Sequence, residues 1–258
     1  MKIGVIGLGL IGGSIFKRLI QDGFDVVGIS QSQIGKNIFK DFSILTSCDV
    51  VFVCTPMSKT IETLDKISGV VPQNALVTDV CSLKSFILNK EYPFMFIPSH
   101  PMAGTEFSGY ENSNPQMFEG AKWVITPLDS NTKSEILESL ILSMGATPIY
   151  TTPELHDEAV AMISHAPLVL AQALFKTAEK NNLAMHLASS GFRDSTRLAG
   201  SNPEMAIDML SLNKENIVKS LLEIHETVNT LLTNYDKELV TELSNKRKAM
   251  YIEGKNTF

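Results

Sequence analysis

Short apolar runs alternate with longer amphipathic stretches through the first part of the chain, from Lys2 to about Tyr150. Alternation of this kind is typical of βαβ units, whose right-handed crossovers build a mostly parallel sheet. The predicted strands cover Lys2 to Ile6, Asp25 to Ile29, Asp49 to Cys54, Ala75 to Thr78, Phe94 to Ile97, Trp123 to Thr126 and Thr147 to Tyr150.

The pattern after Pro153 is helical only, from Leu155 to Phe258. One apolar stripe repeats at spacings of 3, 4 and 7 and comprises Ile217, Leu221, Ile224, Val228, Leu231, Leu232 and Tyr235. The chain is therefore predicted to form a Rossmann-type α/β domain over residues 1–151 and an all-helical domain over residues 152–258. A helical domain of this size has a limited core, so we expect part of its apolar surface to be buried against a second copy in a homodimer.

Composition narrows the range of partners. The 258 residues carry a formal net charge of -6, and this dispersed negative charge disfavours nucleic acid and anionic membranes. The apolar runs are too short to span a bilayer and the chain begins with a strand pattern, so we expect a cytoplasmic protein without a membrane anchor. Cys48, Cys54 and Cys81 follow no metal-ligand spacing and predict reduced thiols, with no metal site.

A glycine-rich turn follows the first predicted strand. Gly7, Gly9 and Gly12 form a GxGxxG pattern that leads into a helical stretch. In this context the glycines serve a tight turn, a close approach of the backbone to a pyrophosphate and close helix–strand packing. Dinucleotide binding is favoured over an ordinary turn, with contacts from Gly7, Leu8, Gly9, Leu10, Ile11 and Gly12.

The end of the second strand bears on the identity of the cofactor. An enzyme that uses NAD usually has Asp or Glu there to bind the ribose 2′-hydroxyl, whereas this chain has Ser30, Gln31 and Ser32. These side chains can donate to a 2′-phosphate, and Lys36 adds positive charge. NADP is therefore predicted, and NAD remains the alternative because the loop has no arginine.

Two further strand ends are expected to line the same crevice. The predicted cofactor contacts there are Cys54, Thr55, Pro56 and Asp79, with Ser82 facing the reacting centre. The alternative is that Thr55 and Ser82 only cap helices. Lys84 reads as a surface charge or an ion-pair partner of Asp79.

His100 follows the strand from Phe94 to Ile97 and precedes Pro101, which restricts it to extended conformations. A histidine at a strand's carboxyl end suits acid–base chemistry, although a loop histidine that caps a turn is an equal alternative.

Several charged and polar side chains in the helical half are further candidates. Arg193 and Arg197 lie four residues apart, either as ligands or as a surface ion-pair cluster with Asp194. We expect the segment that carries them to be partly a loop, because Asn202 and Pro203 mark a helix start. His156 reads as a polar cap or a site residue, and His165 as a hydrogen-bonded interior histidine or a ligand.

With these residues in order, the chain resembles the prephenate/arogenate dehydrogenase (TyrA) family of tyrosine biosynthesis over essentially its whole length. The resemblance is carried by GLGLIGGS at 7–14, CTP at 54–56, DVCSLK at 79–84, SHPMAGTE at 99–106, HDEAVAMISHAP at 156–167 and ASSGFRDSTRLAGSNPE at 188–204. The last three motifs, in this order, are the most specific.

The resemblance implies oxidative decarboxylation of a cyclohexadienol with hydride transfer to a nicotinamide. By motif match His100 would be the catalytic base for the C4 hydroxyl, and Ser82 would orient His100. Arg197 would bind a substrate carboxylate. The resemblance also implies substrate contacts from Thr105, His165 and Arg193.

One departure from the family pattern bears on the substrate. Many prephenate-specific relatives carry SHxPH, whereas this chain has Leu168 in the place of the second histidine. With the predicted NADP preference this makes it similar to the NADP-dependent arogenate dehydrogenases of cyanobacteria. Glu106 could pair with an amino group, and a solvated position is the equal alternative. Arogenate is the predicted substrate, and prephenate is the alternative.

Two rival functions remain at this point. A β-hydroxyacid dehydrogenase or imine reductase shares the glycine-rich start, but commonly depends on Lys or Asp on the interdomain helix, where this chain has His156, Asp157 and His165. A non-catalytic NADP-sensing dimer would need the cofactor site but neither His100 nor Arg197.

Overall fold

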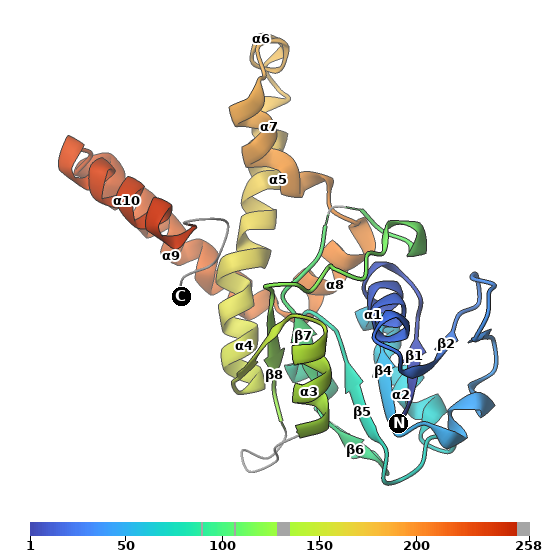
Figure 1. Ribbon diagram of the computed structural model, residues 1–258. Coiled ribbons are helices and arrows are strands. Elements are labelled where there is room, and N and C mark those ends of the chain that lie inside the picture. Colours follow the sequence, from blue (N-terminus) through green and yellow to red (C-terminus); the bar gives the residue numbers. More distant parts are fainter. Residues whose placement is uncertain (89, 106, 128–134, 252–258) are drawn as a thin grey trace.

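The computed structural model describes residues 1–88, 90–105, 107–127 and 135–251. An α/β lobe comprises the first part of the chain and a helical lobe the rest (Figure 1). The predicted order of a mostly parallel sheet followed by an all-helical domain is confirmed.

The main sheet has six parallel strands in the order β3-β2-β1-β4-β5-β6. Their bounds are β1 Lys2–Ile6, β2 Asp25–Ile29, β3 Ile38–Phe39, β4 Val50–Val53, β5 Leu76–Asp79 and β6 Met95–Phe96. Five of them match predicted runs. The sequence pattern missed β3, because two residues are too few for a periodic signal.

A second, three-stranded sheet continues the chain after β6. It comprises β7 Ser99–Pro101, β8 Lys122–Ile125 and β9 Thr147–Tyr150, in that order. The β7–β8 pair is antiparallel and the β8–β9 pair is parallel. The expectation that His100 lies in a loop beyond a strand is wrong, since it pairs with Val124 inside β7.

Helices cover both faces of the main sheet. On β1, Ile3 and Val5 belong to one core cluster, with side chains of α1 and α3, whereas Ile6 belongs to the cluster that includes α2. Burial on alternate faces is the period-two pattern of a doubly covered strand. The helices of this lobe are α1 Leu10–Gln21, η1 Phe42–Ser47, α2 Met57–Ile67, η2 Ser85–Ile87, η3 Tyr110–Asn112 and α3 Glu135–Ser143.

The helical lobe is built around one nearly continuous helix, in which the π-helical turn η4 joins α4 to α5 just before Pro167. Proline removes a backbone donor, and a π turn accommodates such a break. The elements are α4 Pro153–Val160, η4 Ala161–His165, α5 Ala166–Ala178, α6 Asn182–His186, α7 Ser190–Thr196, η5 Arg197–Gly200, α8 Pro203–Leu212, α9 Lys214–Thr233 and α10 Lys237–Met250. Asn202 caps α8 as predicted, but the segment before it is helical almost throughout rather than a loop.

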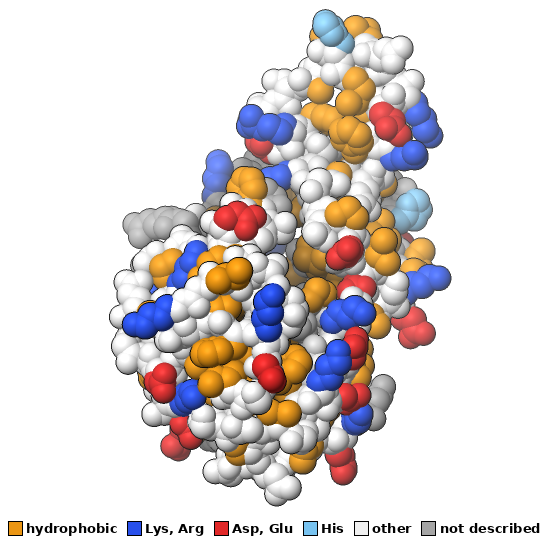
Figure 2. Space-filling model, turned by 90° about the vertical axis from the view of Figure 1, so that its right-hand side faces the viewer, with side chains coloured by type: hydrophobic (Ala, Val, Ile, Leu, Met, Phe, Trp, Pro, Cys, Tyr) orange, Lys and Arg blue, Asp and Glu red, His pale blue; other side chains and the backbone are white. Residues whose placement is uncertain are grey.

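Much of the apolar surface of this lobe is uncovered. In the predicted stripe on α9, Ile217 is 2% exposed, whereas Leu232 is 75% and Tyr235 is 70% exposed. Figure 1 shows α9 and α10 projecting away from the sheets, and Figure 2 shows apolar side chains gathered on the upper, helical lobe. The helix over 153–178 is long and apolar enough, by length and composition, to cross a membrane, and only 33% of its most apolar window is buried. In the fold it is the central helix against which α7 and α9 pack.

A buried ion pair connects the two sheets. Lys84 and Asp79 are fully buried, and the Lys84 ammonium contacts the Asp79 carboxylate while donating to the Ser99 carbonyl at 2.7 Å. The Asp79 carboxylate also accepts the Cys81 N–H at 2.8 Å and the Ser99 N–H at 3.3 Å. Of the two alternatives for Lys84, the ion-pair partner is confirmed and the surface charge is wrong.

We predict that Lys84→Met lowers the free energy of unfolding by about 3–5 kcal/mol, because it leaves the Asp79 carboxylate buried without a counter-charge. The measurement is equilibrium unfolding in urea. Lys90→Met is the matched control, since it removes an exposed pair with Asp65 and should cost about 1 kcal/mol or less. Equal losses in the two variants would contradict a structural role for the buried pair.

Candidate functional site

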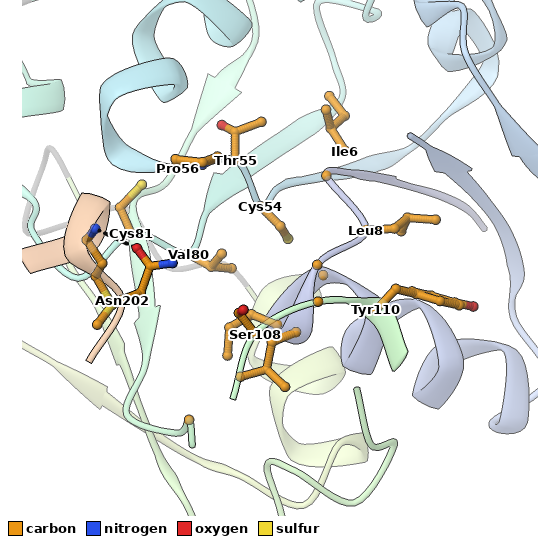
Figure 3. Close-up of a pocket in the computed structure, with 18 of the residues that line it drawn as sticks. Ile6, Leu8, Cys54, Thr55, Pro56, Val80, Cys81, Ser108, Tyr110 and Asn202 are labelled. Atoms are coloured by element: carbon orange, nitrogen blue, oxygen red, sulfur yellow. Dashed lines mark hydrogen bonds between the residues drawn. The ribbon is translucent and has the colours of Figure 1, made fainter. Parts of the chain in front are cut away.

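A cavity of about 740 Å³ opens along the carboxyl edge of the main sheet. Its walls come from the glycine turn, the ends of β4 and β5, the segments 100–105 and 107–111 and the start of α8. In Figure 3, Asn202 of the helical lobe lies on the opposite side of the cavity from Leu8 and Tyr110. Both lobes therefore contribute to one site.

The glycine turn fits the pyrophosphate of a dinucleotide. Gly7 has φ +88°, and a Cβ on Gly12 would lie 2.0 Å from the Gly7 carbonyl oxygen, so both positions require glycine. A Cβ on Gly9 would meet nothing within 4 Å, which leaves the backbone there open to a ligand. Helix α1 has no side-chain cap and no acidic residue in its first turn, so its N–H groups and partial positive charge remain available to an anion.

The loop after β2 lies in the wall of the same cavity. Ser30 is nearly buried, and its hydroxyl accepts the N–H groups of Ser32 and Gln33 at 3.3 and 3.0 Å. Gln31 and Ser32 are exposed and line the cavity. The loop thus offers hydroxyl and amide groups to a ribose without a repelling carboxylate.

The predicted residues at the end of β4 are all in the wall of the cavity: Cys54, Thr55 and Pro56. Pro56 is the cap residue of α2 and makes no side-chain capping bond, so the alternative that Thr55 caps this helix is wrong. The Thr55 hydroxyl lies 3.1 Å from the Thr60 hydroxyl instead. Burial raises the pKa of the Cys54 thiol, which keeps it protonated and uncharged beside a ligand.

The end of β5 contributes Ser82 but not Asp79. Ser82 lines the cavity, and its hydroxyl lies 3.4 Å from the Met57 sulfur. Asp79, which we predicted as a cofactor contact, is fully buried beneath this edge and bound to Lys84, so it does not line the cavity.

His100 lines the cavity and is hydrogen-bonded to another histidine. His100 Nδ1 lies 3.0 Å from His156 Nε2, and the ring centroids are 5.2 Å apart at 79°. The serine predicted to orient His100 makes no hydrogen bond to it within the described residues. Burial lowers the pKa of His100 well below its usual 6.5, and the nearby His156, Lys84 and His165 lower it further. The ring is therefore uncharged at neutral pH, which is the state a general base requires.

His156 is bonded in turn to its neighbour in α4. His156 Nδ1 lies 2.8 Å from Asp157 Oδ1, and both side chains are buried. The Asp157 carboxylate also accepts the N–H groups of Lys84 and Ser85, each at 2.9 Å. Burial alone raises the pKa of Asp157, but these hydrogen bonds outweigh burial and lower it. Since Thr152 caps α4, the reading of His156 as a helix cap is wrong.

Of the four residues predicted to bind the substrate, one lies in the wall of the cavity and three do not. Thr105 lines the cavity, whereas Arg193 is exposed and paired with Asp194, and Arg197 is exposed at the start of η5 outside the cavity. His165 is buried, with Nδ1 3.3 Å from the Asn213 amide and no partner for Nε2 among the described residues. Glu106 lies outside the described residues.

Sequence reasoning missed two parts of the wall. Tyr110 comes from the loop that covers the start of α1, where a Cβ on Gly13 would lie 2.7 Å from the Tyr110 ring. Asn202, Met205 and Asp208 come from α8, and of these the sequence identified only the cap. The described residues form no group of three or more His, Cys, Asp or Glu side chains that could hold a metal ion.

Comparison with known proteins places the chain among dehydrogenases. Two consecutive family models match it, the prephenate dehydrogenase nucleotide-binding domain over residues 27–150 and the prephenate dehydrogenase dimerization domain over residues 152–246. The prephenate dehydrogenase of Bacillus subtilis (strain 168) is 31% identical over 258 residues, which span 90% of this chain and 69% of the relative.

Two solved structures are similar over almost their full length. The arogenate dehydrogenase of Synechocystis is 33% identical, with a TM-score of 0.78 and 97% of both chains covered. The prephenate dehydrogenase of A. aeolicus, solved with hydroxyphenyl propionate and NAD+, is 29% identical, with a TM-score of 0.80 and 98% of both chains covered. The likeness therefore includes both lobes.

Proposed function

The chain belongs to the prephenate dehydrogenase family, and from this premise we propose that it oxidatively decarboxylates L-arogenate to L-tyrosine with NADP+. The observation that carries the proposal is the uncharged, partly buried imidazole of His100 in the wall of the same cavity as the glycine turn. When bound there, the nicotinamide accepts a hydride from C4 of the substrate.

His100 supplies the acid–base part of this reaction. Its ring takes the proton of the C4 hydroxyl while C4 loses the hydride and becomes a carbonyl carbon. The ring carboxylate leaves as CO2, its bonding electron pair aromatises the ring, and the resulting phenolate takes a proton back from the His100 imidazolium. An imidazole suits this step because its lone pair is free at neutral pH. Ser82 and Thr105 line the same cavity and are proposed to contact the substrate near this hydroxyl.

The charge of the cavity favours arogenate over prephenate. Among its described lining residues the charged side chains are Glu111, Glu204 and Asp208, all acidic. Arogenate carries an ammonium group that prephenate lacks, and acidic walls attract it. Leu168, where many prephenate-specific relatives have a second histidine, is buried in an apolar cluster and offers no polar contact.

The substrate carboxylates still need a cation. From the motif match we assign this role to Arg197, because a guanidinium binds a carboxylate through two hydrogen bonds. Its side chain is exposed and lies outside the described wall of the cavity, so the assignment rests on the motif and not on the cavity lining. Arg193 and His165 remain secondary candidates. For the cofactor, Gln31 and Ser32 in the cavity wall, with Lys36 four residues further along the chain, favour NADP+. The alternative is NAD+, which the A. aeolicus relative holds.

The proposal is tested by assaying reduction of NADP+ and of NAD+ with arogenate and with prephenate. We expect turnover with arogenate and NADP+, and a kcat lower by about 10²–10⁴-fold in His100→Asn, because general base catalysis is lost. His186→Asn, which changes an exposed histidine of α6, is the control and should behave as wild type.

Each other result of this assay has a defined meaning. A preference for prephenate would mean that prephenate, and not arogenate, is the substrate. A preference for NAD+ would mean that NAD+, and not NADP+, is the cofactor. Cofactor binding without turnover of either substrate would support the non-catalytic sensor instead. Normal turnover by His100→Asn would contradict the role of His100.

We also propose that the helical lobe pairs with a second copy of the chain. The exposed apolar side chains on α5, α9 and α10 support this, since a surface of this kind is costly to leave in water. The match of residues 152–246 to a dimerization domain points to the same lobe.

The pairing is tested by light scattering after size-exclusion chromatography. We expect twice the 28.3 kDa mass of one chain for the wild type, and a shift toward one chain for Leu222→Glu, which places a charge on the exposed face of α9. The matched control is Leu142→Glu on α3, because the two leucines are 59% and 58% exposed. A wild type that runs as a single chain, or equal effects of the two variants, would exclude this interface.

A further inference from the structure

We propose that His156 and Asp157 are positioning residues that hold His100 in the tautomer with its proton on Nδ1, so that Nε2 keeps a lone pair for the substrate hydroxyl. This inference rests on the proposed function of His100 as the base. It assigns to two residues of the helical lobe a role in a reaction whose base lies in the other lobe.

The protonation of the His100–His156–Asp157 chain can be worked out from Asp157. Its Oδ1 accepts the Lys84 N–H and its Oδ2 accepts the Ser85 N–H, so both oxygens face donors. A carboxylate in this setting is ionised and acts only as an acceptor. The contact of 2.8 Å with His156 Nδ1 therefore requires that His156 donates its Nδ1 proton.

The position of the proton on His100 follows from the position of the proton on His156. A neutral imidazole that carries its proton on Nδ1 has a lone pair on Nε2. His156 Nε2 is then an acceptor, and the contact of 3.0 Å requires His100 to donate from Nδ1. His100 Nε2 is left with a lone pair, and this is the remaining nitrogen of a ring that lines the cavity. The contacts thus select the one neutral form of His100 that can take a proton from a ligand.

The same geometry resists rotation of the His100 ring. If His100 turned its other edge toward His156, the hydrogen bond to His156 Nε2 would be lost and a buried acceptor would be left unpaired, which is unfavourable. The arrangement has the logic of a triad, in which a carboxylate fixes the tautomer of the ring that does the chemistry. Here a second imidazole stands between the carboxylate and the base.

Contacts from three elements hold the carboxylate in place. The backbone of Lys84 and Ser85 binds its oxygens, and the side-chain amide of Asn213, before α9, donates to the Asp157 carbonyl at 2.8 Å. The hydroxyl of Thr152 caps the first turn of α4, in which His156 and Asp157 lie. The tautomer of the base therefore depends on the docking of the helical lobe against the sheet.

The test is a long-range ¹H–¹⁵N NMR spectrum of the full-length protein labelled in its five histidine rings. The wild type should show His100 protonated on Nδ1 and unprotonated on Nε2, with the signals assigned by their loss in His100→Asn. A His100 protonated on Nε2 would overturn the proposal, because it would mean that His156 donates to His100. This result does not depend on any variant of His156 or on turnover.

Variants of His156 test the consequence for catalysis. His156→Phe keeps a ring but removes both nitrogens, so His100 should populate both tautomers and kcat should fall roughly 10–100-fold with an unchanged KM for NADP+. His156→Gln returns an acceptor and should recover part of both the tautomer and kcat. Val160→Ala, one turn further along α4 and equally buried, is the control for packing loss and should leave the tautomer as in wild type.

The outcomes separate this inference from the function on which it rests. If the wild type turns over and His156→Phe keeps both the tautomer and kcat, the positioning role is wrong and the function stands. If neither substrate is turned over while the spectrum shows the expected tautomer, the function is wrong and the hydrogen-bond order stands.

Discussion

The buried ion pair between Lys84 and Asp79 is the contact on which the arrangement of the site depends. It joins the end of β5 to the first residue of β7 through the backbone of Ser99. The backbone N–H groups of Lys84 and Ser85 also bind the Asp157 carboxylate of the helical lobe. One short segment thus sets the position of the strand that carries His100 and of the helix that carries its partner.

The two lobes divide the chemical tasks. The parallel sheet provides a glycine turn and strand ends that suit a dinucleotide, as open α/β sheets do at their carboxyl edge. The small second sheet places a histidine beside that site, and the helical lobe supplies the hydrogen bonds that orient it. A dehydrogenase that must handle a hydride, a proton and a carboxylate gains from this division, because each group is fixed by a different element.

Local patterns in the sequence predicted the parts that local forces determine. The glycine turn, the alternation of strands with helices and the Asn202 cap follow from neighbouring residues, and the structure has them. Strands β8 and β9 match predicted runs, but β7 and its antiparallel pairing with β8 were not predicted, because β7 has only three residues and its pairing is a tertiary contact. The same holds for the burial of Lys84 and for the contact between His100 and His156, which are 56 residues apart. The sequence marked these residues as candidates but did not predict their contacts, and the motif resemblance assigned the orienting role to Ser82.

The central claim is that an uncharged His100 accepts the substrate proton. Its most direct test is the pH dependence of kcat/KM for arogenate, which reports the pKa values of the essential acid and base groups in the free enzyme. Because burial lowers the pKa of His100 below 6.5, the base form persists as the pH falls through 6.5, and activity should be lost only at lower pH. An acidic limb at or above 6.5, or one that persists unchanged in His100→Asn, would contradict the account.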